Sequence, residues 1–394
     1  MHRMREFRCI CRRSVRPQLR LNRRVDLFAG TGDAQRLSMR LMRGEAAEIP
    51  DADVAAVLGH EPVAAFRFAE ERLRGRRRRT TDEPVFCHSA DIAMRALDLG
   101  YGPRTVMAGL LHDVVEEAAP EPEAMAALLG EVVRRFGADT GRDVRVLTNR
   151  YSALMDAVRR EVPLNLPFVD GSREIVAGAL RGLRDRMPPE VSAAYAFEFH
   201  QLLDYFLPRA DVARGAPRAL VDRGHSVFAE LALQTYRVFS EDMADDARSR
   251  SGPSSGVFCE TPLVVKCMDL VDNLRTAEVV SWRALDRILL KSEMFLDATF
   301  YLHDHLHGME APDVTFISAY DFLKHQLVEQ MEERARALAY LADTRFAPLA
   351  DFLEGQLGRL RRKYQVGRNP VEGLARLRNR IRALNVPRRS SRQG

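Results

Sequence analysis

The chain of 394 residues has no long hydrophobic run. Its longest apolar stretches, such as residues 106–111, are far too short to cross a bilayer, which takes about 20 apolar residues in one helix. The arginine-rich start of the sequence also lacks the apolar segment that a secretory leader needs. We therefore expect a cytoplasmic protein with no membrane partner.

Cysteine is scarce, with five residues, and their spacing matches neither a disulfide framework nor a zinc ribbon. Cys9 and Cys11 are the closest pair in the sequence, and we favour reduced thiols over a metal role for them. Gly30 to Gly32 has neither the preceding strand nor the following helix of a dinucleotide-binding loop. A sustained alternation of apolar and polar residues is also missing, so no β-sheet is predicted.

Positive charge is in slight excess, with a formal net charge of +5. Arginines gather in residues 1–24, in residues 73–79 and from Arg359 onward. Basic segments attract polyanions, so contact of these segments with nucleic acid is one interpretation. We favour the simpler interpretation that both ends of the chain are solvated tails.

What the sequence does contain is helical periodicity. From about Asp51 onward, apolar residues recur at helical spacing and predict an all-α protein. The segments with this spacing are residues 51–75, 88–99, 104–118, 121–136 and 142–160, followed by 218–247, 262–281, 283–307 and 313–343.

Composition divides the chain into three parts. We predict a basic, partly disordered segment (1–50), one helical domain (51–345) and a basic tail (346–394). Prolines interrupt a block at about 150–258 that is interposed within the helical domain. This block ends near the sequence RSRSGPSSG, which is typical of a flexible loop.

The first chemically suggestive stretch is LLHDVVEE, within the predicted helix 104–118. Because each helical residue turns by about 100°, His112 and Glu116 share a face, with Asp113 and Glu117 beside them. Apolar residues occupy the opposite face, so the polar stripe should face a cleft. An adjacent imidazole and carboxylate offer one nitrogen and one oxygen ligand to a metal ion. A solvated acidic face is the simpler alternative.

Two further stretches carry residues of the same chemistry. Upstream, His88 stands at the start of an apolar-periodic helix, where a structural histidine would also fit. Downstream, VVKCMDLVDN predicts a mostly buried helix on which Asp269 and Asn273 share a face, with Lys266 one turn earlier. A carboxylate in so apolar a run is costly unless it is paired or bound to metal.

Together the three stretches resemble the signature of the HD superfamily, in the form found in the ppGpp hydrolases of the RelA/SpoT family. That family carries an arginine nine residues before a histidine with Glu-Pro between them, then H-D-x-x-E-D, then K-x-x-D-x-x-x-N-x-R-T. The matching residues are Arg79, Glu83, Pro84 and His88, then His112, Asp113, Glu116 and Glu117, then Lys266, Asp269, Asn273, Arg275 and Thr276. The resemblance implies an HD-domain helical bundle with block 150–258 as a large helical insertion.

The resemblance also implies a cofactor, one divalent metal ion that is commonly manganese. The ligands it implies are His88, His112, Asp113 and Asp269. Glu116 and Glu117 would orient or deprotonate a water on the metal and pass a proton to the leaving group.

The substrate implied is a small-molecule nucleotide of the ppGpp type, which would lose its 3′ pyrophosphate. Arg79, with Lys266 and Arg275 as further candidates, would neutralise phosphate charge. Asn273 would orient Asp269 or touch the nucleotide. Arg79 could instead be one more solvated arginine in its basic run.

Two features depart from the family pattern: Glu117 replaces the usual aspartate, and block 150–258 is much longer than in compact hydrolases. Two other functions stay open, an HD phosphohydrolase acting on another nucleotide or phosphoester, and a non-catalytic HD scaffold that binds nucleotide or nucleic acid. The sequence does not predict the oligomeric state. We interpret His303, His305 and His307 as a surface cluster rather than a second metal site.

Overall fold

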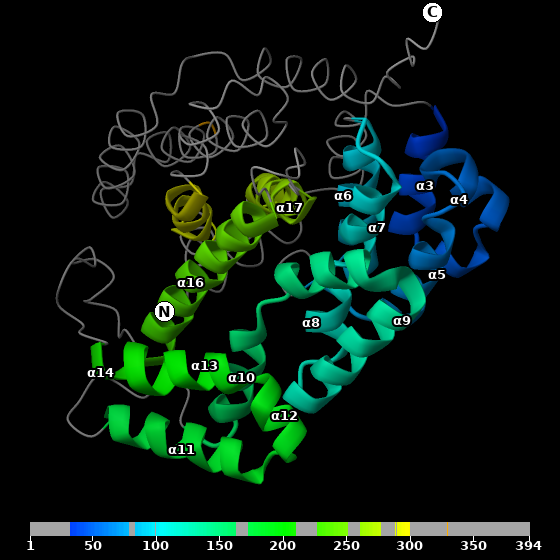
Figure 1. Ribbon diagram of the computed structural model, residues 1–394. Coiled ribbons are helices and arrows are strands. Elements are labelled where there is room, and N and C mark those ends of the chain that lie inside the picture. Colours follow the sequence, from blue (N-terminus) through cyan, green and yellow to red (C-terminus); the bar gives the residue numbers. More distant parts are fainter. Residues whose placement is uncertain are drawn as a thin grey trace, which may run out of the picture. The chain divides into compact units, whose positions relative to one another are not determined.

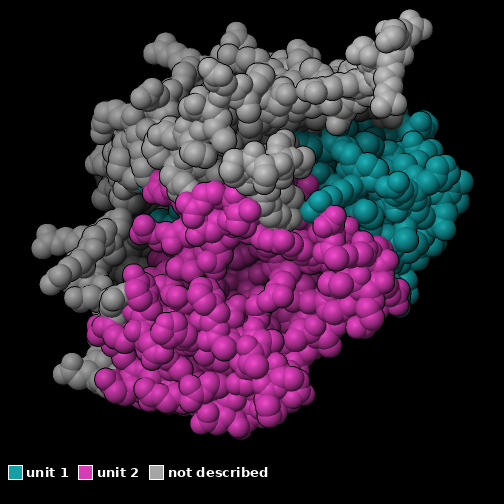
Figure 2. Space-filling view, viewed as in Figure 1, with its two compact units in different colours: residues 1–111, 263–296, 302–394 teal, residues 112–262, 297–301 magenta. Residues whose placement is uncertain are grey.

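The computed structural model describes residues 32–78, 83–98, 100–162, 172–209, 227–250 and 261–276, together with 288, 290–299 and 329. Within this part of the chain the regular elements are helices (Figure 1). One isolated antiparallel bridge, between Arg77 and Pro84, is also present there. The all-α prediction is therefore confirmed. The chain divides into two compact units, which Figure 2 colours separately.

The first unit comprises residues 1–111, 263–296 and 302–394. Its described helices are α3 (Gly32–Met42), the short 3-10 helix η1 (Ala46–Glu48), α4 (Asp51–Leu58), α5 (Val63–Leu73), α6 (Val85–Asp98), α7 (Pro103–Leu111) and α17 (Thr261–Thr276).

Helix α6 forms the centre of this unit, since every residue from Val85 to Met94 is buried. Helices α3, α4, α5 and α7 pack against it. Phe66 of α5 meets Phe86 edge to face, with the ring centres 4.8 Å apart. Ser38 of α3 donates a hydrogen bond to Asp91 at 3.4 Å. Burial on all sides explains why so few residues of α6 are charged.

The closest approach of α7 to α6 is made possible by Gly109. A Cβ atom at this position would lie 3.2 Å from the Cα and N atoms of Ala93 and 3.3 Å from Cγ2 of Ile92. Carbon atoms in normal contact are about 3.5–4.0 Å apart, so a larger residue would crowd the backbone of α6. The glycine therefore sets the spacing between α6, which carries His88, and the end of α7 at Leu111.

The second unit comprises residues 112–262 and 297–301. Its described helices are α8 (Val114–Ala118), α9 (Pro122–Leu147), α10 (Arg150–Arg159), α11 (Ser172–Arg186), α12 (Pro189–Ala194), α13 (Ala196–His200), the π-helix η2 (Gln201–Phe206), α14 (Leu207–Arg209) and α16 (Val227–Arg250).

A buried ionic cluster joins three elements of the second unit. Arg150 of α10 pairs with Glu198 of α13 at 3.0 Å, and its guanidinium lies 4.5 Å from the ring centre of Tyr195. Tyr195 is 1% exposed, and its hydroxyl donates to the carbonyl oxygen of Pro122 at 3.4 Å. Burial raises the pKa of Tyr195 to about 12, although the charge of Arg150 opposes this shift.

Several predicted helices are interrupted in the structure. The segment 51–75 forms two helices, α4 and α5, because the chain turns at Gly59 with a φ of 85°. The segment 142–160 likewise breaks between Leu147 and Arg150. Helix α9, in contrast, continues beyond the predicted 121–136 through a kink at Gly137, whose φ is 84°.

Regular structure also begins earlier than Asp51. Within the segment 1–50, α3 buries Leu37 and Leu41, so part of that segment belongs to the core. The second unit starts at residue 112, earlier than the predicted block 150–258. The three-part division of the chain itself stays a prediction. Residues 1–31, the tail 346–394 and almost all of segment 313–343 lie outside the described residues.

Among the described helices, none combines the length and the apolar character needed to span a bilayer.

Candidate active site

Helix α6 places His88 in its first turn, as the sequence predicts, and the residue is 2% exposed. The chain before α6 is held by two backbone hydrogen bonds that flank the bridge. The N–H of Arg78 donates to the carbonyl of Glu83 at 2.8 Å, and the N–H of Val85 donates to that of Arg76 at 3.0 Å. These two bonds hold the backbone of residues 76–78 beside residues 83–85, and so keep Arg78 close to the start of α6.

Helix α17 presents the predicted acidic residue together with its neighbours. Asp269 is 6% exposed, and its Oδ2 atom accepts from the ammonium of Lys266 at 2.7 Å. Its Oδ1 atom accepts from the amide of Asn273 at 2.6 Å. Residues three and four apart share a helix face, which is why the three side chains meet. Asn273 thus contacts Asp269, as one of the two roles predicted from the sequence requires, and the role itself stays a prediction.

The predicted continuous helix 104–118 is wrong, because α7 ends at Leu111 and α8 begins at Val114. His112 and Asp113 occupy the turn between them, and Asp113 has φ −94° and ψ −9°. Adjacent side chains on a regular helix point about 100° apart. Here Nε2 of His112 lies 3.2 Å from Oδ1 of Asp113. The two side chains are therefore in contact at the interruption between α7 and α8.

Three of the four predicted ligands form a cluster. His88, His112 and Asp269 are all buried, and each offers one ligand atom within 4.8 Å of the others. Ligands around one ion with bonds of about 2.1 Å are about 3.0 Å apart when adjacent and about 4.2 Å apart when opposite. The spacing thus requires only a small contraction around an ion. Asp113 contacts His112 but is outside this group of three.

The contacts of the two ring nitrogens of His88 are also compatible with a metal ion. Its Nδ1 lies 2.7 Å from Oδ2 of Asp272, and its Nε2 lies 3.0 Å from Oδ1 of Asp269. An imidazolium would donate to both carboxylates, whereas a neutral imidazole that donates from Nδ1 leaves Nε2 to coordinate a cation together with Asp269. Two imidazoles and one carboxylate are a donor set that suits a divalent transition metal.

The sequence reasoning missed Asp272, a buried carboxylate of α17 with three charged or imidazole partners. It is 2% exposed and contacts His88, Arg78 at 3.1 Å and Arg95 at 3.0 Å. Burial alone would raise the pKa of this carboxyl, but the hydrogen bond and charge of His88 and the two arginines lower it well below its usual value. Its position three residues after Asp269, in the same apolar run, was a signal that could have been used.

The two predicted acid–base residues differ in their surroundings. Glu116 is half-buried, and its Oε1 atom accepts from the backbone N–H of Asn149 at 2.5 Å. Glu117 is exposed, and its N–H donates to the carbonyl of Asp113 at 2.9 Å. Their catalytic roles stay predictions.

Other predicted residues lie outside the described part of the chain. Nothing is described for Arg79 or for the side chain of Arg275, so their roles stay predictions. The neighbouring Arg78 is described, and it donates to Oδ1 of Asn273 at 2.6 Å. The residues His303, His305 and His307 also fall outside the described ranges.

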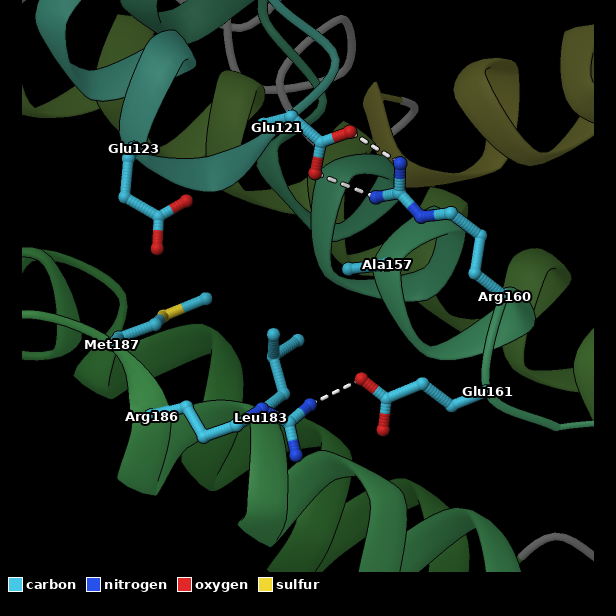
Figure 3. A pocket seen from close by; sticks show the side chains of 8 residues that line it. All are labelled: Glu121, Glu123, Ala157, Arg160, Glu161, Leu183, Arg186 and Met187. Atoms are coloured by element: carbon cyan, nitrogen blue, oxygen red, sulfur yellow. Dashed lines mark hydrogen bonds and ion pairs between the residues drawn. The ribbon is translucent and has the colours of Figure 1, made fainter.

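The second unit contains a separate hollow of about 280 Å³ (Figure 3). Arg160 pairs with Glu121 and Arg186 pairs with Glu161 at its rim, while Met187 contributes apolar surface. These ion pairs neutralise much of the charge that lines the hollow. None of its lining residues belongs to the three motifs.

Parts of this sequence are similar to known proteins. The HD domain family matches residues 65–149, a stretch that contains His88, His112 and Asp113. Over 90 residues the chain is 31% identical to guanosine-3′,5′-bis(diphosphate) 3′-pyrophosphohydrolase of Aquifex aeolicus, covering 21% of this chain and 13% of the relative. Over 95 residues it is 32% identical to GTP pyrophosphokinase of Streptomyces coelicolor, covering 24% of this chain and 10% of the relative.

No solved structure matches the chain. The matched stretches span about a tenth of the length of each relative. Within residues 65–149, His88 lies in the first turn of α6, and His112 and Asp113 lie between α7 and α8. Residues 65–149 are therefore similar to the HD domain family, and part of the chain resembles a hydrolase of the RelA/SpoT type.

Proposed function

We propose that this protein is a metal-dependent nucleotide phosphohydrolase of the HD type, and that it removes the 3′ pyrophosphate from ppGpp. The observation that carries the proposal is the buried cluster of His88, His112 and Asp269, three residues from three separate motifs. The named activity of the Aquifex relative supports ppGpp as the substrate.

A divalent ion in this cluster would lower the pKa of a bound water and so supply the nucleophile. His88, His112 and Asp269 would hold the ion, with Asp113 as the fourth ligand. Lys266 and Asn273, which contact the two oxygens of Asp269, would keep that carboxylate in one orientation. Manganese is the ion that the family resemblance implies.

In the reaction, the water oxygen forms a bond to the phosphorus attached to the 3′ oxygen of the ribose. The bond between that phosphorus and the 3′ oxygen breaks, and the 3′ oxygen takes up a proton. The products are GDP and pyrophosphate. Glu116 would act as one acid–base group, and the backbone N–H of Asn149 holds one of its oxygens in place. Glu117 would act as the second proton carrier, and Arg79 and Arg275 would bind phosphate oxygens.

The test uses the purified full-length chain, stripped of metal with a chelator and then supplied with Mn²⁺, Mg²⁺ or Zn²⁺. Each sample is incubated with ppGpp, GTP, GDP and a simple phosphodiester, and the products are separated by anion-exchange chromatography. We expect GDP and pyrophosphate from ppGpp, and no products from the variant Asp269→Asn. The control Asp185→Asn changes an exposed carboxylate outside the motifs and should retain activity.

The alternatives predict different results. Turnover of GTP or of the phosphodiester without turnover of ppGpp would identify an HD phosphohydrolase of another specificity. Metal binding without turnover of any substrate would favour the non-catalytic scaffold. Either result would refute ppGpp hydrolysis.

A further inference from the structure

The two nitrogens of His88 face two different carboxylates. Nε2 is directed toward Asp269, a member of the candidate metal cluster. Nδ1 lies 2.7 Å from Asp272, which is outside that cluster and is one helical turn further along α17. The shorter contact is thus made by the carboxylate that does not belong to the cluster.

We propose that Asp272 is a positioning residue for the metal centre: it accepts the Nδ1 proton of His88 and so keeps Nε2 free of a proton and directed at the metal. The inference rests on the proposed metal-dependent function. A histidine that binds a metal through one nitrogen commonly donates its other N–H to a carboxylate, which fixes the ring and its tautomer. The distance of 2.7 Å is that of a strong, charge-assisted hydrogen bond.

The carboxylate of Asp272 is itself held in one orientation. Arg95 donates to its Oδ1 atom at 3.0 Å, and Arg78 donates to its Oδ2 atom at 3.1 Å. The two arginine side chains are only 10% and 11% exposed. Since both oxygens have a cationic donor, the carboxylate cannot rotate away from His88 without breaking an ion pair in a buried site. Such a breakage is costly.

The arginines also connect this carboxylate to the metal cluster. Arg95 lies seven residues after His88, two turns along the same face of α6. Arg78 donates both to Asp272 and to Asn273, and Asn273 in turn donates to Asp269. One hydrogen-bonded chain therefore fixes His88 and Asp269, the two ligands on α6 and α17. A carboxylate that served only to neutralise the arginines would not need to contact the imidazole.

The first measurement needs no variant. Metal-free protein labelled with ¹⁵N-histidine is studied at pH 8 by long-range ¹H–¹⁵N correlation, which reports the tautomer of each imidazole. The signal of His88, one of ten histidines, is identified by its loss in His88→Asn. We expect the Nδ1–H form. A neutral His88 with its proton on Nε2, or with no tautomer preference, would overturn the inference.

The second measurement compares metal affinity in variants. Mn²⁺ is titrated by calorimetry into the metal-free full-length protein and into Asp272→Asn, whose fold is checked by far-UV circular dichroism. Loss of such an outer partner typically weakens metal binding by about 10- to 100-fold. Asp246→Asn is the matched control, because Asp246 likewise accepts from an arginine, Arg142, at 2.8 Å and lies outside the three motifs. The control should bind Mn²⁺ like the wild type.

The outcomes separate the two proposals. If the wild type binds Mn²⁺ and Asp272→Asn binds it equally well, Asp272 has no positioning role, while the proposed function survives. If the wild type binds no divalent ion, the proposed function fails, whatever the tautomer of His88. Weaker binding in Asp272→Asn with a changed His88 tautomer supports the inference.

Discussion

The substitution Gly109→Ala tests the packing that spaces the motif-bearing helices. The added Cβ would lie 3.2 Å from two backbone atoms of Ala93 on α6. Normal contact requires about 3.5–4.0 Å, so α6 and α7 would have to separate by roughly 0.3–0.8 Å. Because the crowded atoms are backbone atoms, no side-chain rotation can relieve the contact.

Two opposing effects set the size of the change in stability. Overpacking of a close contact costs about 1–3 kcal/mol. Alanine in place of glycine within a helix gains about 1 kcal/mol. We therefore expect the free energy of unfolding of Gly109→Ala to fall by about 0–2 kcal/mol. Because a functional site tolerates displacements of only about 0.5 Å, Mn²⁺ affinity should also fall.

Gly178→Ala is the control, because Gly178 is exposed within α11 and a Cβ there would meet no atom within 4 Å. This variant should gain about 1 kcal/mol from helix propensity alone. Urea unfolding followed by circular dichroism compares the two variants, and calorimetry compares their Mn²⁺ affinities. If Gly109→Ala is stabilised as much as Gly178→Ala and binds Mn²⁺ like the wild type, the argument from helix spacing is refuted.

Three further predictions concern the site and the second unit. Glu116→Gln and Glu117→Gln should retain metal but lose about 10² to 10⁴ in turnover of ppGpp, and full activity in both variants would contradict their acid–base role. Arg79→Lys should slow ppGpp hydrolysis, because lysine lacks the planar guanidinium that binds phosphate through two hydrogen bonds. Arg77→Lys should change the rate little, and equal rates in the two variants would remove Arg79 from the site. Tyr195 should ionise at about pH 12, because burial raises its pKa. The native state then keeps a proton that the unfolded state loses near pH 10, so the stability of the native state should fall as the pH rises above 10. The titration is measured as the difference in phenolate absorbance between the wild type and Tyr195→Phe. A midpoint near pH 10 would contradict this prediction.

The sequence alone was sufficient for the fold class and for the motif residues. Helical periodicity is a local property, so apolar spacing predicted α6, α9, α16 and α17, although it gave no segment for α3 or α11. The ligand set that includes His88, His112 and Asp269 came from the resemblance to the HD signature, because the local surroundings of each residue also fit a structural role. Helix ends were less well predicted, because a turn such as that at Gly59 depends on how the flanking helices pack.

Only the tertiary structure decided which of these residues meet. His88 and Asp269 are 181 residues apart in the sequence, and their side chains lie 3.0 Å apart because α6 and α17 belong to one unit. The interruption of the helix at His112 and the contacts of Asp272 were equally absent from the local pattern. The sequence around an aspartate in an apolar run does not distinguish an aspartate that binds a metal from one that binds an arginine or an imidazole. Its role is set by the partners that packing brings to it, and those partners come from distant parts of the chain.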